Sequence, residues 1–309
     1  MKKIVVMGPN PAWQKTLFFT RLQMGEVNRA DSMASYAAGK GVNCCRAARC
    51  FGAAEPTLVQ FCGGPNGELL ETALREEKIA FSSAHTSTPT RCCTTLLDRA
   101  TGSMTELIEP SHTVTASEID LLLKLFDEAA EDAAGAALCG SLPGKTSPEL
   151  YHRAAEIARK RGLVLLVDAC REIEPLLAAG GRVVLKINRS ELESLTRVSG
   201  IRAGIDALFG RYPLMGAAIT DGGSAAVAGD GKRIVRFALP EIEVTSPLGC
   251  GDTATAVTLS EIVNGKTLFE AFRAALGAAS ANCLSATSGQ FGRADADRLA
   301  DAIVMTDEI

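Results

Sequence analysis

The chain has 309 residues, of which 47% are hydrophobic and 22% are charged. This composition suits one large α/β domain or two small ones and excludes a disordered chain. The formal net charge is −4, from 32 basic and 36 acidic residues, so nothing points to a nucleic-acid partner. The longest aliphatic run, 163–167, is far short of the ~20 residues that a bilayer span needs. The apolar run 4–7 is too short for a signal-peptide core. We therefore expect a soluble, cytoplasmic protein with no membrane partner.

The ten cysteines raise the question of a disulfide framework. Two pairs are adjacent in the sequence, 44–45 and 92–93, and no C-x-x-C is present. The three histidines make no metal-ligand spacing with the cysteines or with one another. We expect reduced thiols that serve as small buried hydrophobes.

The first 110 residues mix helical segments with short β-prone segments. Strand 3–7 ends at Gly8-Pro9-Asn10-Pro11, and a helix is expected from Gly39 to about residue 51, where Gly52 stops it. Segments 94–98 and 104–108 flank a turn and predict a hairpin. The other elements expected here are the β-prone segments 16–22 and 27–36, strand 57–61 and helix 67–78.

From residue 115 onward the predicted strands and helices alternate. Thr115-Ala116-Ser117-Glu118 is a capping box that opens a helix to about residue 130. Ser147-Pro148 opens a second helix with Ser147 as its N-cap. The remaining expected elements are strands 136–139, 163–167, 183–187 and 217–220, helices near 172–178 and 190–197, a hairpin of 225–228 with 234–238, and helices from 251 and from 267.

This alternation requires a mostly parallel sheet with helices on both faces. The β-prone segments near 13–36 and 91–108 do not fit it, and we assign them to a small accessory sheet that serves as a lid. Ligands of parallel sheets bind beyond the C-terminal ends of the strands. Candidate groups occur at these ends: Asn10, Gly140-Ser141, Asp168, Asn188 and Thr220-Asp221-Gly222.

The segment 246–253, Ser-Pro-Leu-Gly-Cys-Gly-Asp-Thr, directly precedes an apolar helical run. The small residues Gly249, Cys250 and Gly251 allow close approach to a ligand, and the helix N-terminus directs N–H groups at it. A transferring phosphoryl group would be stabilised there. Asp252, in the first turn, is placed to act as general base on a hydroxyl. The alternative is that Asp252 only caps its helix and the glycines make a tight turn.

Two further segments carry groups suited to an oxygen-rich ligand. The segment 38–43, Ala-Gly-Lys-Gly-Val-Asn, opens a helix but lacks the Walker spacing, which rejects a P-loop. No G-x-G-x-x-G follows the first strand, which argues against a dinucleotide-binding Rossmann domain. In the segment 186–191, the oxygens of Asn188 and Glu191 suit Mg²⁺ held through water. Taken alone, the first segment is also explained as a helix-start turn and the second as a surface turn with a solvated Glu191.

In type, order and separation these motifs resemble the ribokinase-like (PfkB) family of ATP-dependent carbohydrate kinases, over essentially the whole chain. Within that family the chain looks most like the branch of 1-phosphofructokinase and tagatose-6-phosphate kinase. The branch likeness is carried by the segments 10–12, 25–29, 98–102, 105–107 and 139–143. The resemblance implies one kinase domain over 1–309. It also implies a three-layer α/β/α sandwich with a mostly parallel sheet and a small β-sheet lid from segments about 13–36 and 88–110.

The resemblance also implies roles for individual residues. Asp252 matches the catalytic base, with Gly249, Cys250 and Gly251 as the anion hole. The matched substrate positions are Gln14, Gly39, Lys40, Asn43, Arg91 and Ser141, and Arg91 would face the phosphate that the substrate already carries. The matched ATP positions are Lys186, Asn188, Thr220, Asp221, Gly222, Gly223 and Ala225, and Asn188 and Glu191 would hold Mg²⁺ through water. The implied reaction is transfer of phosphate from ATP to a hydroxyl of a phosphorylated ketohexose, and lids of this kind often pair into homodimers.

The chain departs from the family pattern at several positions. Gln14 stands where the family's Asn-Pro-Ala-x-Asp supplies an aspartate that holds sugar hydroxyls, and a neutral amide donates as well as accepts hydrogen bonds. Other departures are Ala38 for glycine, Ile187 for proline, Cys250 for alanine, Ala225 for glycine and Val257 for a helix glycine. Two alternatives therefore stay open: a kinase of another sugar or of a nucleoside on the same fold, and a non-catalytic sugar-phosphate-binding protein.

Overall fold

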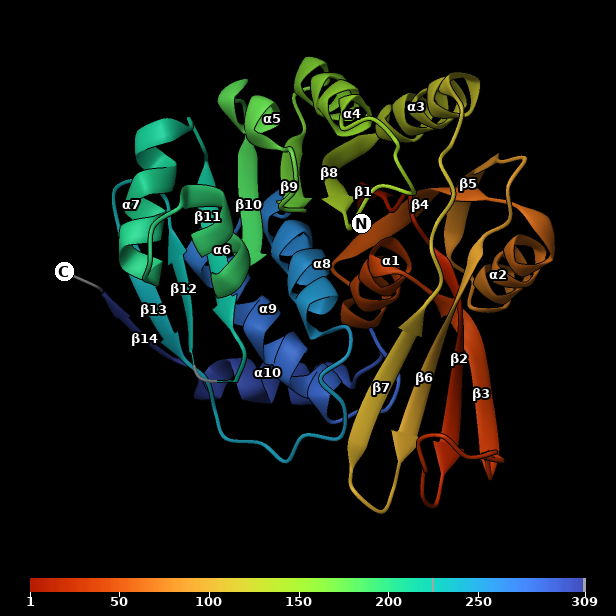
Figure 1. Cartoon of the computed structure of the whole chain (residues 1–309). Coiled ribbons are helices and arrows are strands. Elements are labelled where there is room, and N and C mark those ends of the chain that lie inside the picture. Colours follow the sequence, from red (N-terminus) through yellow and green to blue (C-terminus); the bar gives the residue numbers. More distant parts are fainter. Residues whose placement is uncertain (224, 308–309) are drawn as a thin grey trace.

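The computed structural model describes residues 1–223 and 225–307, and its largest feature is a ten-stranded sheet (Figure 1). One part of this sheet is parallel and the part beyond β11 is antiparallel, as the predicted alternation followed by a hairpin requires. The parallel strands are, in spatial order, β5 (Ala80–His85), β4 (Ala54–Cys62), β1 (Lys2–Met7), β8 (Ala133–Cys139), β9 (Val164–Asp168), β10 (Val183–Asn188) and β11 (Gly216–Asp221). The antiparallel extension consists of β12 (Ala225–Gly229), β13 (Ile234–Ala238) and β14 (Val304–Asp307).

Helices cover both faces of this sheet (Figure 1). Because side chains alternate along a strand, Val5 and Met7 of β1 pack into one apolar core, while Ile4 and Val6 pack into the other. The first core is covered by α3 (Ala116–Ala130), α4 (Glu149–Lys160), α5 (Glu174–Ala178), α6 (Arg189–Thr196) and α7 (Ile201–Arg211). The opposite face is covered by α1 (Lys40–Phe51), α2 (Gly64–Glu76), α8 (Cys250–Val263) and α9 (Leu268–Cys283), with α10 (Arg293–Ala302) against α9. The predicted three-layer α/β/α architecture is confirmed.

A separate four-stranded sheet projects from the main body (Figure 1). Its spatial order is β3 (Ser32–Ala38), β2 (Ala12–Phe19), β6 (Arg91–Asp98) and β7 (Ser103–Ile108). The predicted hairpin is present as the antiparallel pair β6–β7. All six residues of β7 are exposed. This small sheet is the predicted accessory sheet, and β2 follows β1 after only four residues, so it begins beside the C-terminal edge of the main sheet.

The β-prone segments expected at 16–22 and 27–36 each overlap a strand of the small sheet, but the bounds of the strands differ. The observed strands span Ala12–Phe19 and Ser32–Ala38, and residues 20–31 form a loop. In that loop the Asn28 side chain accepts from the Gln23 N–H and donates to the Gln23 carbonyl, at 2.8 and 2.7 Å. Such local side-chain bonds compete with strand pairing.

Several element boundaries and four elements also differ from the prediction. The helix expected at 67–78 begins at Gly64. The helix expected after Ser147 begins at Glu149, although Ser147 Oγ does accept from the Glu149 N–H at 3.2 Å. The elements that the sequence analysis missed are β5, α7, α10 and β14.

Candidate active site

A cleft of about 780 Å³ opens at the C-terminal edge of the parallel strands. The residues that follow β1, β8 and β9 line it, together with the first turn of α1 and two residues of the small sheet. The charged residues in its lining are Lys40, Arg91, Asp168, Arg171, Glu172 and Glu191. Of the expected strand-end groups, those after the first strands line this cavity, namely Asn10, Gly140, Ser141 and Asp168, whereas Asn188 and Thr220-Asp221-Gly222 are not among its lining residues.

Asp252 lies in the first turn of α8 and is only 8% exposed. Asn43, from α1, donates through Nδ2 to Asp252 Oδ2 at 2.8 Å. Within the described residues this is the hydrogen bond made by the Asp252 carboxylate, and no backbone N–H of its own turn donates to it. The geometry therefore disfavours the alternative in which Asp252 only caps its helix.

A second buried carboxylate, Asp168 at the end of β9, is 1% exposed and holds two cations. Lys40 Nζ lies 2.8 Å from Asp168 Oδ1, and Lys186 Nζ lies 3.3 Å from Oδ2. The Thr255 hydroxyl also donates to Oδ2, at 2.6 Å. Lys186 is 4% exposed, so its charge is matched inside the protein rather than by water.

These contacts move the pKa values of the two carboxyls in opposite directions. Burial raises the pKa of Asp252, and the negative charge of Asp168 raises it further, against the opposing effect of Asn43 and the two lysines. Burial also disfavours the Asp168 carboxylate, but Lys186, Lys40 and Thr255 outweigh it and lower the pKa of that carboxyl. Asp168 is therefore fixed as a carboxylate, while Asp252 is the carboxyl with the greater affinity for a proton.

The turn before α8 has the backbone shape that the motif predicts. Gly249 is the N-cap, with φ +78°, in the left-handed region that favours glycine. A Cβ at Gly251 would lie only 3.0 Å from Lys186 Nζ, so the ammonium lies directly against this glycine. The N–H groups of a helix start and a buried cation thus lie close together, which suits an anion.

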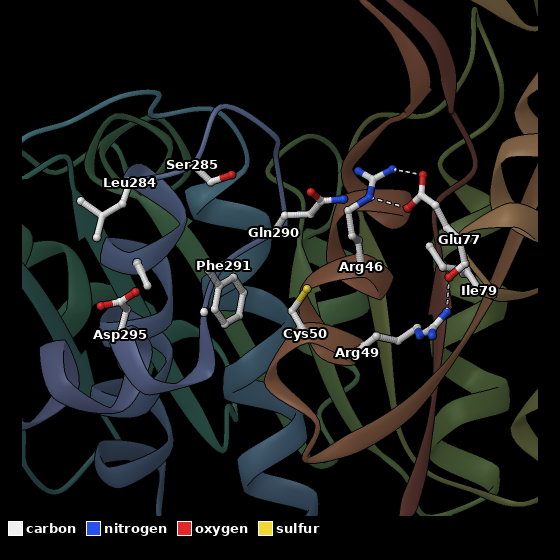
Figure 2. Close-up of a pocket in the computed structure, with 12 residues that line it drawn as sticks. Arg46, Arg49, Cys50, Glu77, Ile79, Leu284, Ser285, Gln290, Phe291 and Asp295 are labelled. Carbon is white, nitrogen blue, oxygen red and sulfur yellow. Dashed lines mark hydrogen bonds and ion pairs between the residues drawn. The ribbon is translucent and has the colours of Figure 1, made fainter.

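The Asn43 side chain in turn accepts a hydrogen bond from Arg46, which lies one turn further along α1. Arg46 Nη1 donates to Asn43 Oδ1 at 3.2 Å and to the Ser288 carbonyl at 3.1 Å. Two further bonds, of 2.6 and 2.7 Å, join Arg46 to the carboxylate of Glu77. Figure 2 shows this pair on the wall of a second cavity of about 710 Å³, whose lining shares no residue with the cleft.

The segment predicted to organise Mg²⁺ and phosphate forms the start of α6. Asn188 Oδ1 accepts from the Glu191 N–H at 2.9 Å, and Glu191 Oε2 accepts from the Asn188 N–H at 2.8 Å, a reciprocal capping box. Glu191 also lines the cleft. Its carboxylate therefore faces the site while one of its oxygens holds the helix start.

A model of the pfkB family of carbohydrate kinases matches residues 1–291. The chain belongs to this family. It is an ATP-dependent sugar kinase. The resemblance found in the sequence is thereby confirmed at the level of the family.

Solved structures show the same fold for this pfkB kinase. Escherichia coli phosphofructokinase-2 in complex with fructose-6-phosphate is 20% identical, with a TM-score of 0.89 over 98% of this chain and 99% of that chain. A possible 1-phosphofructokinase from Thermotoga maritima is 16% identical, with a TM-score of 0.88 over 99% and 100%. A carbohydrate kinase from Agrobacterium tumefaciens is 25% identical, with a TM-score of 0.77 over 99% and 100%. The Escherichia coli protein has also been solved in a tetrameric inhibited form.

The structure of this kinase brings most of the predicted substrate residues to the cleft. Gly39, Lys40, Arg91 and Ser141 line it, and Asn43 contacts Asp252. Gln14 does not line it: its amide is buried in the small sheet and donates to Thr95 Oγ1 at 2.9 Å.

The predicted nucleotide loop follows β11 at the same sheet edge. Asp221 is paired with Arg189, at 3.2 Å, while Gly222 and Gly223 are exposed and Ala225 is buried as the first residue of β12. Ser224, within this loop, lies outside the described residues. Lys186, another predicted ATP residue, contacts Asp168 and lies against Gly251 of the anion turn.

Several residues that build the site do not belong to the sequence motifs. Asp168 is predicted only as a strand-end group, and Arg46 and Thr255 are outside every predicted set. A signal existed for Arg46, since Asn43 and Arg46 lie three residues apart on one helix and so share a face. In the described part of the chain, no helix has the length and apolar run that crossing a bilayer requires.

Proposed function

We propose that this kinase transfers the γ-phosphate of ATP to a hydroxyl of a phosphorylated ketohexose, as 1-phosphofructokinase and tagatose-6-phosphate kinase do. The observation that carries the proposal is the buried Asp252 carboxylate, held by Asn43 in the first turn of α8 and next to the Lys186–Gly251 contact. This arrangement places a proton acceptor, the Asp252 carboxylate, at a helix start whose N–H groups can stabilise an anion.

The phosphate already on the sugar would bind at the side of the cleft that faces the small sheet. Arg91 lines the cleft and uses one nitrogen, Nη2, to donate to the Asn10 carbonyl at 3.2 Å. Its Nε is buried with no hydrogen-bond partner in the described residues. A buried, unpaired guanidinium N–H is costly, and a phosphate oxygen would satisfy it.

In the proposed reaction, Asp252 accepts the proton of the sugar hydroxyl as that oxygen forms its bond to the γ-phosphorus. The bond from phosphorus to the bridging oxygen of ATP breaks, which leaves ADP, the sugar ester and a proton on Asp252. The N–H groups at Gly249, Cys250 and Gly251, with Lys186 beside them, stabilise the charge on the transferring group.

The remaining predicted positions would hold the nucleotide. We assign Asn188, Thr220, Asp221, Gly222, Gly223 and Ala225 to this side of the site, with Lys186 acting at the phosphates. The carboxylate of Glu191 in the cleft fits Mg²⁺ bound through water, with Asn188 beside it. When bound, the ion would neutralise part of the charge on the phosphates of ATP. The residues 1–309 would act as one kinase unit, with the small sheet as a lid that excludes water.

We also propose that two copies pair through the lid. Its outer strand β7 is exposed along its whole length, and two exposed apolar side chains, Leu107 of β7 and Met33 of β3, lie on the same face of the sheet. Apolar side chains gathered on an exposed sheet suit a second copy of the same surface.

The test is Mg·ATP-dependent release of ADP with a panel of acceptors: fructose 1-phosphate, fructose 6-phosphate, tagatose 6-phosphate, their unphosphorylated parents, ribose and a nucleoside. We expect turnover of one phosphorylated ketohexose and at least a tenfold lower kcat/KM for its parent. Turnover of a neutral sugar or nucleoside alone would contradict the phosphate site at Arg91 and favour a kinase of another sugar or of a nucleoside. Ligand binding without ADP release from any acceptor would favour the non-catalytic alternative.

A further inference from the structure

Two cysteines that lie far apart in the sequence meet at the anion turn. Cys250 is the first residue of α8 and Cys283 is the last residue of α9, and the two helices pack with these ends together (Figure 1). Their sulfur atoms are 2.9 Å apart. Because a disulfide bond is about 2.05 Å long, the sulfurs need to approach by only about 0.9 Å to form one.

The surroundings of this pair differ from those of the other close thiols. Cys44, Cys45 and Cys139 are fully buried in the core, where a reagent cannot reach them. Cys250 and Cys283 are each partly exposed, beside the loop 239–248, in which no residue is buried. The pair therefore combines proximity with access.

We propose that Cys250 and Cys283 form a redox-modification site, which a low-molecular-weight disulfide oxidises to an intramolecular disulfide bond that stops phosphoryl transfer. The Cys283 thiolate attacks one sulfur of the reagent, forms a mixed disulfide and releases one thiolate. Cys250 then loses its proton to solvent and attacks the Cys283 sulfur, and the second thiol leaves. Two protein thiols are oxidised and one reagent disulfide is reduced to two thiols, so atoms and electrons balance.

The hydrogen bonding supports this order of events. The Cys250 and Cys283 thiols share one hydrogen bond in which either sulfur can be the donor. This contact lowers the pKa of Cys283, while the contact and burial raise the pKa of Cys250. The thiolate is the attacking form in disulfide exchange. Cys283 is thus the residue that reacts first with the reagent.

The new bond would disturb the turn on which the proposed mechanism depends. Asn282 donates to the Leu248 carbonyl at 2.8 Å and to Cys250 Sγ at 3.2 Å, so the sulfur is part of the network that holds this turn. Drawing Cys250 toward Cys283 displaces its N–H and that of Gly251, together with Asp252. A misplacement of about 1 Å at reacting groups can cost about 100-fold in rate.

The experiment treats the reduced full-length chain with oxidised glutathione and then with dithiothreitol. Non-reducing digestion and mass spectrometry are expected to show a Cys250–Cys283 crosslink with loss of two hydrogens. The kcat for ADP release is expected to fall by at least about tenfold and to return on reduction. Because the crosslink is read by mass, its absence is distinguishable from a wrong choice of sugar, on which only the rate measurement rests.

Two variants make the test specific. Cys283→Ser removes the thiol that reacts first and is expected to keep the basal kcat while losing the response to oxidation. Cys50→Ser removes a partly buried thiol of α1 outside the pair and is expected to keep both. The proposal is overturned if oxidation leaves the pair uncrosslinked, if the crosslinked protein keeps its kcat, or if Cys283→Ser is still inhibited reversibly.

Discussion

Asp252 is placed where its function and the stability of the fold oppose each other. Burial and the neighbouring Asp168 raise the pKa of Asp252, so folding favours its protonated form and the carboxylate that catalysis needs destabilises the fold at neutral pH. Asp252→Asn keeps an acceptor for Asn43 but removes the charge. We expect kcat to fall by about 10²–10⁴-fold and the urea midpoint of unfolding to rise at pH 7.

The matched control for this prediction is Asp168→Asn. The pKa of Asp168 is lowered in the folded state, so its stabilising effect is present above its unfolded pKa and is lost as the pH falls through its folded pKa. The amide would remove the carboxylate that Lys186 and Lys40 contact directly. A loss of about 3–5 kcal/mol in the free energy of unfolding is expected. Near-normal kcat in Asp252→Asn, or a lower urea midpoint, would contradict the assignment.

Arg46 acts on the same carboxyl through Asn43 and is a positioning residue. Its planar guanidinium joins Asn43, Ser288 and Glu77 at once, which the single ammonium of lysine cannot do. Arg46→Lys should therefore loosen the Asn43 amide and weaken its hydrogen bond to Asp252. The kcat is expected to fall by about tenfold or more with an unchanged KM for ATP.

The pH profile separates this positioning effect from a general loss of structure. Asp252 must be deprotonated to accept a proton, so kcat/KM falls as the pH drops through its raised pKa. Weakening the bond from Asn43 raises that pKa further, and the acid limb of Arg46→Lys should move to higher pH. Arg49→Lys changes a residue of the same helix whose side chain donates to the Glu77 carbonyl, and it should leave the profile unmoved. An unshifted acid limb in Arg46→Lys would show that Arg46 matters only for stability.

At the scale of elements, one carboxylate at the start of α6, that of Glu191, has two functions. Glu191 completes a capping box with Asn188 and also lines the cleft. Glu191→Gln keeps an acceptor oxygen for the cap but removes the charge proposed for Mg²⁺. We expect its thermal stability to match that of the parent chain, while the Mg²⁺ concentration for half-maximal activity rises about tenfold.

Glu191→Ala removes both features and completes the comparison. It should lose about 1 kcal/mol of stability with the cap and show at least the same rise in Mg²⁺ requirement. Thermal unfolding and Mg²⁺ titrations of the two variants check this directly. An unchanged Mg²⁺ requirement in Glu191→Gln would leave the residue with its capping function alone.

Local signals decided which elements could be predicted from the sequence. The helices α3, α6 and α9 each begin with a capping box, and all three were expected. The missed helices α7 and α10 follow Gly200 and Gly292, which supply no side chain to cap them. The missed strands β5 and β14 are the two edges of the sheet and are poorly buried, so their side chains do not alternate strongly between apolar and polar.

The features of the site that could be predicted from the sequence are likewise the local ones, whereas the others depend on contacts between residues far apart in the sequence. The turn around Gly249 and the position of Asp252 could be predicted because the motif is contiguous. The contacts that tune Asp252 join residues 209, 128 and 242 positions apart, in Asn43–Asp252, Lys40–Asp168 and Arg46–Ser288. Such pairs depend on the order of strands in the sheet, which no local pattern specifies.

At the scale of the whole molecule, the cleft is closed on one side by the small sheet, whose own outer strand remains uncovered. Leu107 of β7 is 53% exposed, and a two-fold pairing of lids would bring it near its own copy. Leu107→Lys then places like charges across the interface, which costs affinity. We expect a dimer for the parent chain and a monomer for Leu107→Lys in sedimentation velocity.

Val244→Lys is the matched control, because Val244 is 54% exposed and lies outside the small sheet. It introduces the same charge at the same exposure and should leave the dimer intact. If the parent chain sediments as a monomer, or if Leu107→Lys remains a dimer, the lid is not the pairing surface. Since Arg91 and the strands β2 and β6 belong to the same sheet, loss of pairing should also raise the KM for the sugar phosphate more than it lowers kcat.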